Sequence, residues 1–309
     1  MINEKLSKML LEKKDPFTDI LGQDKIKHQL KSALLMRRHI IIVGPPGIGK
    51  TTLAKNIAKL LPGGLKQFIR IQGSPDLTAE DLLGDIDPIK ALKYGPLSLE
   101  AFQKGKIFKA DKGILFFDEL NRCPEKLQNA LLQVLEEGKA TIGSYDVDFD
   151  LDFIFIATMN PEDSSTERLS DVLLDRFDML YMAYPESVEI ETNIVKQKGE
   201  KLDVKFPDNL LDAAVLFVRL LRESDKLEKK PSVRASLGLY ERAQSNALLQ
   251  GRKTVRLEDI EEAAVSVLSH RIRLKPSVKY LQNPKDFVKE ELKKFLDKQE
   301  ELNESGGSR

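Results

Sequence analysis

Residues 40–52 read IIIVGPPGIGKTT, and this stretch decides the fold of the chain. A β-branched apolar run leads into it, and a helix-forming run at residues 53–61 follows. Gly44, Gly49, Lys50 and Thr51 match G-x-x-x-x-G-K-[ST], the P-loop pattern, in the strand-to-helix setting that a P-loop requires. Such glycines let backbone N–H groups face phosphate oxygens, and the helix N-terminus favours negative charge. The stretch therefore predicts a nucleoside triphosphate site.

The side chains of this loop have distinct chemical roles. Lys50 can reach the β- and γ-phosphates, and the Thr51 hydroxyl can bind Mg²⁺. We expect the nucleotide to be held by a continuous run of residues: Gly44, Pro45, Pro46, Gly47, Ile48, Gly49, Lys50, Thr51 and Thr52.

Two further apolar segments end in polar side chains. GILFFDE ends in Asp118 and Glu119, and FIFIAT, residues 153–158, is followed by Asn160 after one methionine. Parallel strands present their carboxyl ends at one edge of a sheet, so we expect these side chains to lie together. Asp118 is then placed for the Mg²⁺ shell and Glu119 to polarise a water for attack on the γ-phosphate. Asn160 is placed to orient that water.

With its motifs in this order, the chain resembles the AAA+ ATPases over most of its length. The resemblance implies hydrolysis of ATP with Mg²⁺. It also implies an α/β fold, an αβα sandwich around a parallel sheet, followed by a smaller all-α lid domain. Residues 15–24, DPFTDILGQD, are similar to the segment that runs alongside the adenine in this family. Ile20, Leu21 and Gly22 are the base contacts that this similarity implies.

The same resemblance assigns roles to two arginines. LLDRFD, residues 173–178, is similar to the arginine-finger box, in which Arg176 reaches the nucleotide of the neighbouring subunit. PSVRA, residues 231–235, is similar to the sensor 2 segment, in which Arg234 approaches the γ-phosphate from the lid.

The residues alone leave other uses open for these arginines. Arg176 can form a local ion pair with Asp175 or Asp178, which is worth little at a surface. Arg234 can be a solvated side chain at the start of a helix. Arg168 is a second candidate for the finger.

Two insertions indicate which branch of the AAA+ ATPases the chain resembles. Lys50 and Asp118 are 68 positions apart, more than one helix and one strand need, and the surplus lies near residues 74–105. After a predicted helix at residues 125–137, residues 139–153 alternate apolar with polar, as in a β-hairpin. Insertions at these places resemble the MoxR and magnesium-chelatase ATPase-subunit branch. That resemblance implies a homo-oligomer, a hexameric ring with loops facing its pore, that remodels a partner protein or assists metal or cofactor insertion. Its partner is then a client or a separate von Willebrand A-type chain.

Composition limits the class of partner and compartment. With 49 basic and 49 acidic side chains the net charge is zero, and residues 140–152 hold four aspartates without a lysine or arginine. We therefore do not expect nucleic acid as the partner, although an MCM-like motor and an ATP-gated assembly switch are the alternatives. The sequence has no signal peptide or membrane-spanning stretch, and its single cysteine, Cys123, fits a reducing compartment. A cytoplasmic protein without membrane insertion is the expectation.

Helical periodicity and turn signals predict four parts. An N-terminal helix occupies residues 1–14, and the nucleotide-binding α/β domain occupies residues 15–185. A helical lid follows at residues 186–275, and residues 276–309 form a C-terminal amphipathic helix with a flexible tail.

Overall fold

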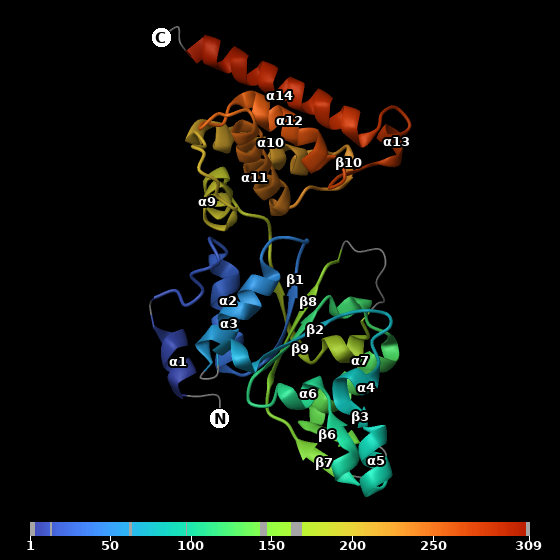
Figure 1. Ribbon diagram of the computed structural model, residues 1–309. Coiled ribbons are helices and arrows are strands. Elements are labelled where there is room, and N and C mark those ends of the chain that lie inside the picture. The colour runs from blue at the N-terminus through green and yellow to red at the C-terminus, as the bar shows by residue number, and fades with distance from the viewer. Residues whose placement is uncertain are drawn as a thin grey trace. The chain divides into compact units, whose positions relative to one another are not determined.

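The computed structural model describes residues 4–12, 14–61, 64–96, 98–142, 147–161 and 169–306. The chain divides into two compact units, Met1–Ala183 and Tyr184–Arg309 (Figure 1). The first unit is α/β and the second is largely helical. No helix within these described ranges is both long and apolar enough to cross a membrane.

A five-stranded parallel sheet forms the centre of the first unit, in the order β2-β5-β8-β1-β9. Its strands are β1 (His39–Val43), β2 (Phe68–Gln72), β5 (Ile114–Asp118), β8 (Ile154–Met159) and β9 (Phe177–Tyr181). The chain leaves β1 for the sheet edge at β2, while β8 and β9 flank β1. The carboxyl end of β1 is therefore a topological switch point, where doubly wound sheets bind ligands.

Helices cover both faces of this sheet. The helices of the unit are α1 (Glu4–Leu11), α2 (Asp24–Leu35), α3 (Lys50–Leu60), α4 (Ala79–Leu83), α5 (Pro88–Tyr94), α6 (Lys106–Lys109), α7 (Glu125–Glu137) and α8 (Asp171–Leu174). α2 and α3 cover one face of the sheet, and α7 covers the other (Figure 1). Ile40 and Ile42 of β1 pack toward the first face, and Ile41 and Val43 pack toward the second. The predicted αβα sandwich with a parallel sheet is confirmed.

Two segments outside the main sheet form their own small sheets. β3 (Gly84–Ile86) pairs antiparallel with β4 (Phe102–Lys104), and β6 (Lys139–Ile142) pairs antiparallel with β7 (Val147–Asp150). Phe149 from the second segment lies 6.5 Å from Phe102 and 5.4 Å from Phe108, measured between ring centroids. Aromatic packing therefore joins the two insertions to each other.

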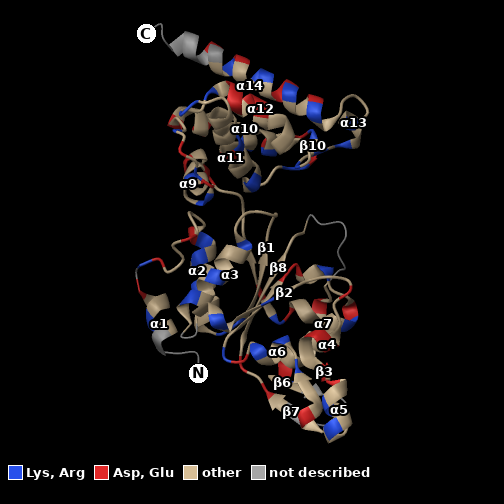
Figure 2. Ribbon diagram, viewed as in Figure 1, with Lys and Arg blue, Asp and Glu red and all other residues tan. Residues whose placement is uncertain are grey.

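The second unit is built from helices with one short strand pair. Its elements are α9 (Val188–Lys198), α10 (Asp208–Glu223), β10 (Leu227–Lys229), α11 (Val233–Leu249), α12 (Leu257–Leu268), β11 (Arg273–Leu274), α13 (Pro276–Lys279) and α14 (Pro284–Gly306). α14 packs into the core of this unit through Phe287 and Phe295, and the Phe295 ring lies 5.5 Å from Phe217. Acidic and basic residues are interspersed along α14, as Figure 2 shows, so this helix combines a packed apolar face with a charged one.

Candidate functional site

The loop between β1 and α3 needs glycine at three positions. Gly47 and Gly49 have φ angles of 74° and 99°, in the left-handed region that favours glycine. A Cβ on Gly44 would lie 2.3 Å from the Met182 carbonyl oxygen. The backbone therefore curls tightly over the carboxyl end of β1, and the α3 N-terminus follows at once.

The side chains of Lys50 and Thr51 provide groups that can bind a phosphate and a metal ion. The Lys50 ammonium donates to the carbonyls of Gly44 at 2.6 Å and Pro45 at 2.7 Å, so it lies inside the curve of the loop. The Thr51 hydroxyl lies 3.4 Å from Asp118 Oδ2. A cation within a glycine loop and a converging hydroxyl and carboxylate fit a triphosphate with Mg²⁺, which prefers oxygen ligands. Bound there, Mg²⁺ would neutralise charge on the β- and γ-phosphates.

Asp118 ends β5 with its carboxylate oriented by neighbours. The Thr158 hydroxyl donates to Oδ1 at 2.6 Å, and Arg70 donates to Oδ2 at 2.6 Å. The Asp118 side chain is only 13% exposed. Arg70 therefore binds Oδ2, the oxygen nearest Thr51. The same oxygen is the one expected to bind a metal ion.

Glu119 has an unusual backbone conformation. Its φ and ψ are 58° and 54°, a left-handed conformation that costs a non-glycine residue roughly 1–2 kcal/mol. Its N–H donates to the Thr158 hydroxyl oxygen at 3.0 Å, while Gln72 and Arg122 bind its Oε2 at 2.9 and 3.1 Å. Strain of this kind persists where surrounding contacts determine the backbone, often at functional sites.

Asn160 directly follows β8, beside the end of β5. Its carbonyl accepts a hydrogen bond from Asn121 Nδ2 at 3.2 Å. Asn121 belongs to the short turn η3 (Leu120–Arg122), which begins immediately after Glu119. The backbones of Glu119 and Asn160 are therefore tied together at one sheet edge, and the water-orienting role of the Asn160 amide stays a prediction.

The segment expected to meet the adenine lies against the P-loop. Ile20 is 6% exposed, and its Cδ1 is 3.5 Å from where a Cβ on Gly49 would lie. Leu21 is half-buried and Gly22 has a φ of 65°. These positions fit a wall beside the nucleotide, and contact with the base stays a prediction.

Arg176 lies at the amino ends of the strands, opposite the carboxyl ends that hold the P-loop. It directly precedes Phe177, which pairs with His39 at the amino end of β1. Its guanidinium donates to the Val172 carbonyl at 2.9 Å and pairs with Glu136 at 2.9 Å. The ion pair with Asp175 or Asp178 considered above is therefore replaced by one with α7.

The sequence assigned possible roles to two further arginines. Arg234 is the second residue of α11 in the second unit, and it is exposed. Arg168 lies outside the described residues.

Several residues of the site were missed from the sequence. They are Arg70, Gln72, Asn121, Arg122 and Thr158. A signal for two of them existed: FIRIQ places Arg70 and Gln72 on one side of a strand, and the register sets Gln72 opposite Asp118. Polar residues at the carboxyl end of an otherwise apolar strand are the pattern that identified Asp118 itself.

The sequence was compared with known families and proteins. The family described as AAA domain (dynein-related subfamily) matches residues 39–177, and the family described as AAA lid domain matches residues 221–291. The chaperone MoxR1 of Mycobacterium tuberculosis is 30% identical over 286 residues, covering 82% of this chain and 73% of that protein. The magnesium-chelatase 38 kDa subunit of Chlorobaculum parvum is 25% identical over 324 residues, covering 84% and 92%.

A solved structure has the same fold. The RuvB Holliday junction branch migration motor of Thermotoga maritima matches with a TM-score of 0.52 at 21% identity, covering 81% of this chain and 70% of that one.

Proposed function

Because the chain belongs to the MoxR and magnesium-chelatase branch of the AAA+ ATPases, we propose that it works as a hexameric ring whose subunits share their ATPase sites. Mg²⁺-dependent ATP hydrolysis in this ring drives the remodelling of a partner protein or assists metal or cofactor insertion. The partner is a client protein or a separate von Willebrand A-type chain.

The position of Arg176 carries the proposal of shared sites. Arg176 lies level with the start of β1, while the P-loop begins at Gly44, five residues beyond His39. At about 3.3 Å per residue the two edges are roughly 16 Å apart. An arginine there is distant from the expected nucleotide site of its own subunit, and a second copy is the partner that the resemblance of LLDRFD suggests.

Within one subunit, the remaining roles in this proposal are those that the sequence predicts, and contacts at the carboxyl ends of the strands support several of them. Lys50 binds phosphate oxygens, and Thr51 and Asp118 hold Mg²⁺. Glu119 polarises the attacking water once its carboxylate leaves Gln72 and Arg122, and Asn160 orients that water. Arg234 completes the site from the lid.

The insertions support a protein client. In α5, Ile89 is 80% exposed and Leu92 is 90% exposed. Exposed apolar side chains on neighbouring turns suit a polypeptide better than a phosphate backbone. Phe149 also packs the hairpin β6–β7 against the aromatic rings of Phe102 and Phe108.

A mixing experiment tests the shared site. Arg176→Ala and Lys50→Ala should each lose most of the turnover, about 10³-fold or more for the arginine. If Arg176 acts on the next subunit, equimolar mixing of the two variants restores part of the activity, because some interfaces pair an intact P-loop with an intact arginine. Mixing Lys50→Ala with Glu119→Gln is the matched control and restores nothing, because both changes lie in the same half of the site.

Two results would contradict the proposal. One is turnover per subunit that stays constant on dilution from oligomer to monomer. The other is a mixture of Arg176→Ala and Lys50→Ala that stays inactive while size measurements show mixed oligomers. Arg168→Ala in the same assay identifies which arginine is the finger: restoration with Arg168→Ala and near-normal turnover of Arg176→Ala would assign the role to Arg168.

A further inference from the structure

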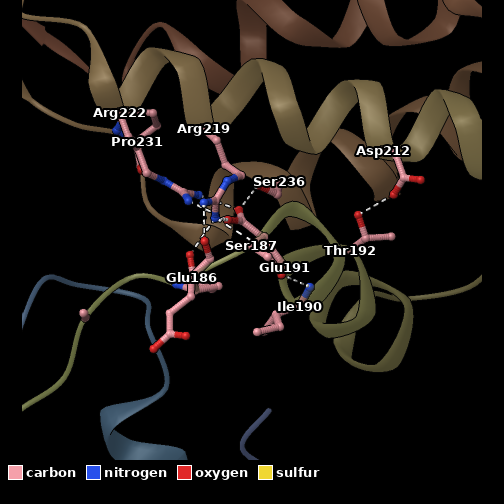
Figure 3. A network of polar contacts seen from close by, with 12 residues as sticks. Glu186, Ser187, Ile190, Glu191, Thr192, Asp212, Arg219, Arg222, Pro231 and Ser236 are labelled. Carbon is pink, nitrogen blue, oxygen red and sulfur yellow. Dashed lines mark hydrogen bonds and ion pairs between the residues drawn. The ribbon is translucent and has the colours of Figure 1, made fainter. Parts of the chain in front are cut away.

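One arginine fastens the segment that enters the second unit to helix α10. Arg219 Nη1 donates to the carbonyls of Pro185 at 2.6 Å and Ser187 at 3.3 Å, and its Nη2 donates to that of Glu186 at 3.1 Å (Figure 3). Only 17% of the Arg219 side chain is exposed. Three successive carbonyl groups therefore converge on a single guanidinium, a geometry that a planar fork of N–H donors provides and a lysine ammonium does not.

A second arginine and a buried carboxylate complete this cluster. Glu191 of α9 is fully buried, and its carboxylate accepts hydrogen bonds from both terminal nitrogens of Arg222 at 2.5 Å (Figure 3). The Ser236 hydroxyl of α11 donates to the same carboxylate at 2.5 Å, and Arg219 lies 3.5 Å from it. A buried carboxylate needs such partners, so α9, α10 and α11 are joined at one point.

Arg222 also contacts two other segments, the one that leads to Arg234 and the one that enters the second unit. Arg222 Nε donates to the Pro231 carbonyl at 2.7 Å, three residues before Arg234. The Arg222 guanidinium carbon lies 4.7 Å from the centre of the Tyr184 ring, a cation–π contact. Arg222 therefore contacts both Tyr184 at the entry to the second unit and the segment leading to Arg234.

The residues just before this segment are fastened to the first unit instead. The Met182 N–H donates to the Val43 carbonyl at 2.8 Å, and the Ala183 carbonyl accepts from Gln23 Nε2 at 2.7 Å. Pro185 then fixes its own φ and restricts Tyr184 to extended conformations. The backbone torsions that remain least restricted are those on either side of the peptide bond between Ala183 and Tyr184.

We propose that Glu191, Arg219 and Arg222 form a clamp that makes residues 184–187 part of the lid. Movement of the lid then turns about Ala183 and Tyr184, and the clamp carries that rotation to Arg234. The three residues are assigned as positioning residues, because their contacts are with the backbone and side chains of the second unit. The link to turnover rests on the proposed role of Arg234, whereas the location of the hinge does not.

The clamp is tested with Arg219→Leu in the full-length oligomer. Arg252→Leu is the matched control, because Arg252 is also 17% exposed and pairs at 2.6 Å with a fully buried carboxylate, Asp259, in the same unit. Backbone hydrogen exchange is measured over residues 184–191 with and without ADP, together with kcat, the KM for ATP and the melting temperature. Arg219→Lys is the conservative variant.

The clamp predicts a specific pattern. Arg219→Leu speeds exchange over residues 184–191 by about tenfold or more and lowers kcat by a similar factor. Arg219→Lys keeps the charge beside Glu191 but recovers only part of either quantity. Arg252→Leu lowers the melting temperature but leaves the exchange rate over residues 184–191 and kcat near their wild-type values.

Exchange over residues 184–191 that is unchanged in Arg219→Leu, or equally raised in Arg252→Leu, would overturn the clamp. Arg234→Ala separates the two proposals. Normal turnover of Arg234→Ala would remove the lid arginine from the site, while the exchange result would still decide whether the clamp exists.

Discussion

Gln72 and Glu119 are 47 positions apart, and the Gln72 side-chain amide donates to Glu119 Oε2 at 2.9 Å. Arg122 binds the same oxygen at 3.1 Å. A carboxylate that acts as a general base must offer its oxygen to the proton of the attacking water. These donors therefore hold the expected base in a resting position, from which it has to be released for hydrolysis.

Gln72→Leu should raise basal turnover. Removing one partly exposed hydrogen bond to a carboxylate changes the balance by about 0.5–1 kcal/mol, which corresponds to roughly a two- to fivefold higher kcat. The KM for ATP should change little, because the Gln72 side chain hydrogen-bonds to Arg70 and Glu119, which lie outside the P-loop. Steady-state kinetics with Gln72→Glu as the comparison provide the check. If Gln72→Leu loses activity as Glu119→Gln does, the amide aligns the base and does not restrain it.

Thr158→Val should lower turnover strongly without preventing nucleotide binding. The Thr158 hydroxyl donates to Asp118 and accepts from the Glu119 N–H, so valine leaves a partly buried N–H without its partner at a left-handed residue. An unsatisfied group of this kind costs about 1–3 kcal/mol, enough for roughly a 10- to 100-fold loss in kcat. Thr158→Ser retains the hydroxyl and is the control. Equal loss in both variants would mean that the methyl group matters and the hydrogen bonds do not.

The fold was predictable because buried parallel strands and amphipathic helices leave strong patterns. The apolar run at residues 113–119 contains β5 (Ile114–Asp118), and the helix predicted at residues 125–137 is α7 (Glu125–Glu137). Each strand of this kind is a continuous apolar stretch, and its polar end marks the ligand edge of the sheet. Asp118 and Glu119 were identified in this way.

The contacts between distant elements were not predictable. Gln72 meets Glu119 only because β2 and β5 pair in one register, which a single sequence does not specify. Glu191, Arg219 and Arg222 lie in three helical turns whose charges indicate solvent exposure, yet all three converge inside the second unit. Charged residues are seldom buried unless paired, and the pairing depends on how the helices pack.

Gly73→Ala should disable the carboxyl end of β5. The Gly73 N–H donates to the Asp118 carbonyl at 2.7 Å, and a Cβ on Gly73 would lie 2.1 Å from the Glu119 carbonyl oxygen. The backbone of Glu119 has to move, and a shift of about 1 Å at a catalytic group costs about 100-fold in rate. Gly113→Ala is the matched control, because its Cβ would crowd the Gln67 carbonyl at the amino end of the same strand.

The comparison separates a local effect from general destabilisation. Both variants should melt at lower temperature than the wild type, but only Gly73→Ala should lose most of its kcat at a temperature where both are folded. Equal kcat values in the two folded variants would show that the Glu119 backbone position is not critical.

His39 should make stability depend on pH. Burial, together with the positive charges of Arg38 and Arg37, lowers the pKa of His39 to about 4. Its Nδ1 accepts from the Phe155 N–H at 3.2 Å, so the neutral ring is the one that the fold requires. Between pH 6.5 and about 4 the unfolded chain therefore binds a proton that the folded chain does not, and stability falls as the pH is lowered through this range.

The expected loss from His39 is roughly 2 kcal/mol at pH 5 relative to pH 7.5. Thermal unfolding of wild type and His39→Asn at the two pH values measures it, because asparagine supplies an acceptor for the Phe155 N–H without titrating. The wild type should lose more of its melting temperature than the variant does. An equal loss in both proteins would mean that other groups account for the acid sensitivity and that the folded His39 accepts a proton near its ordinary pKa.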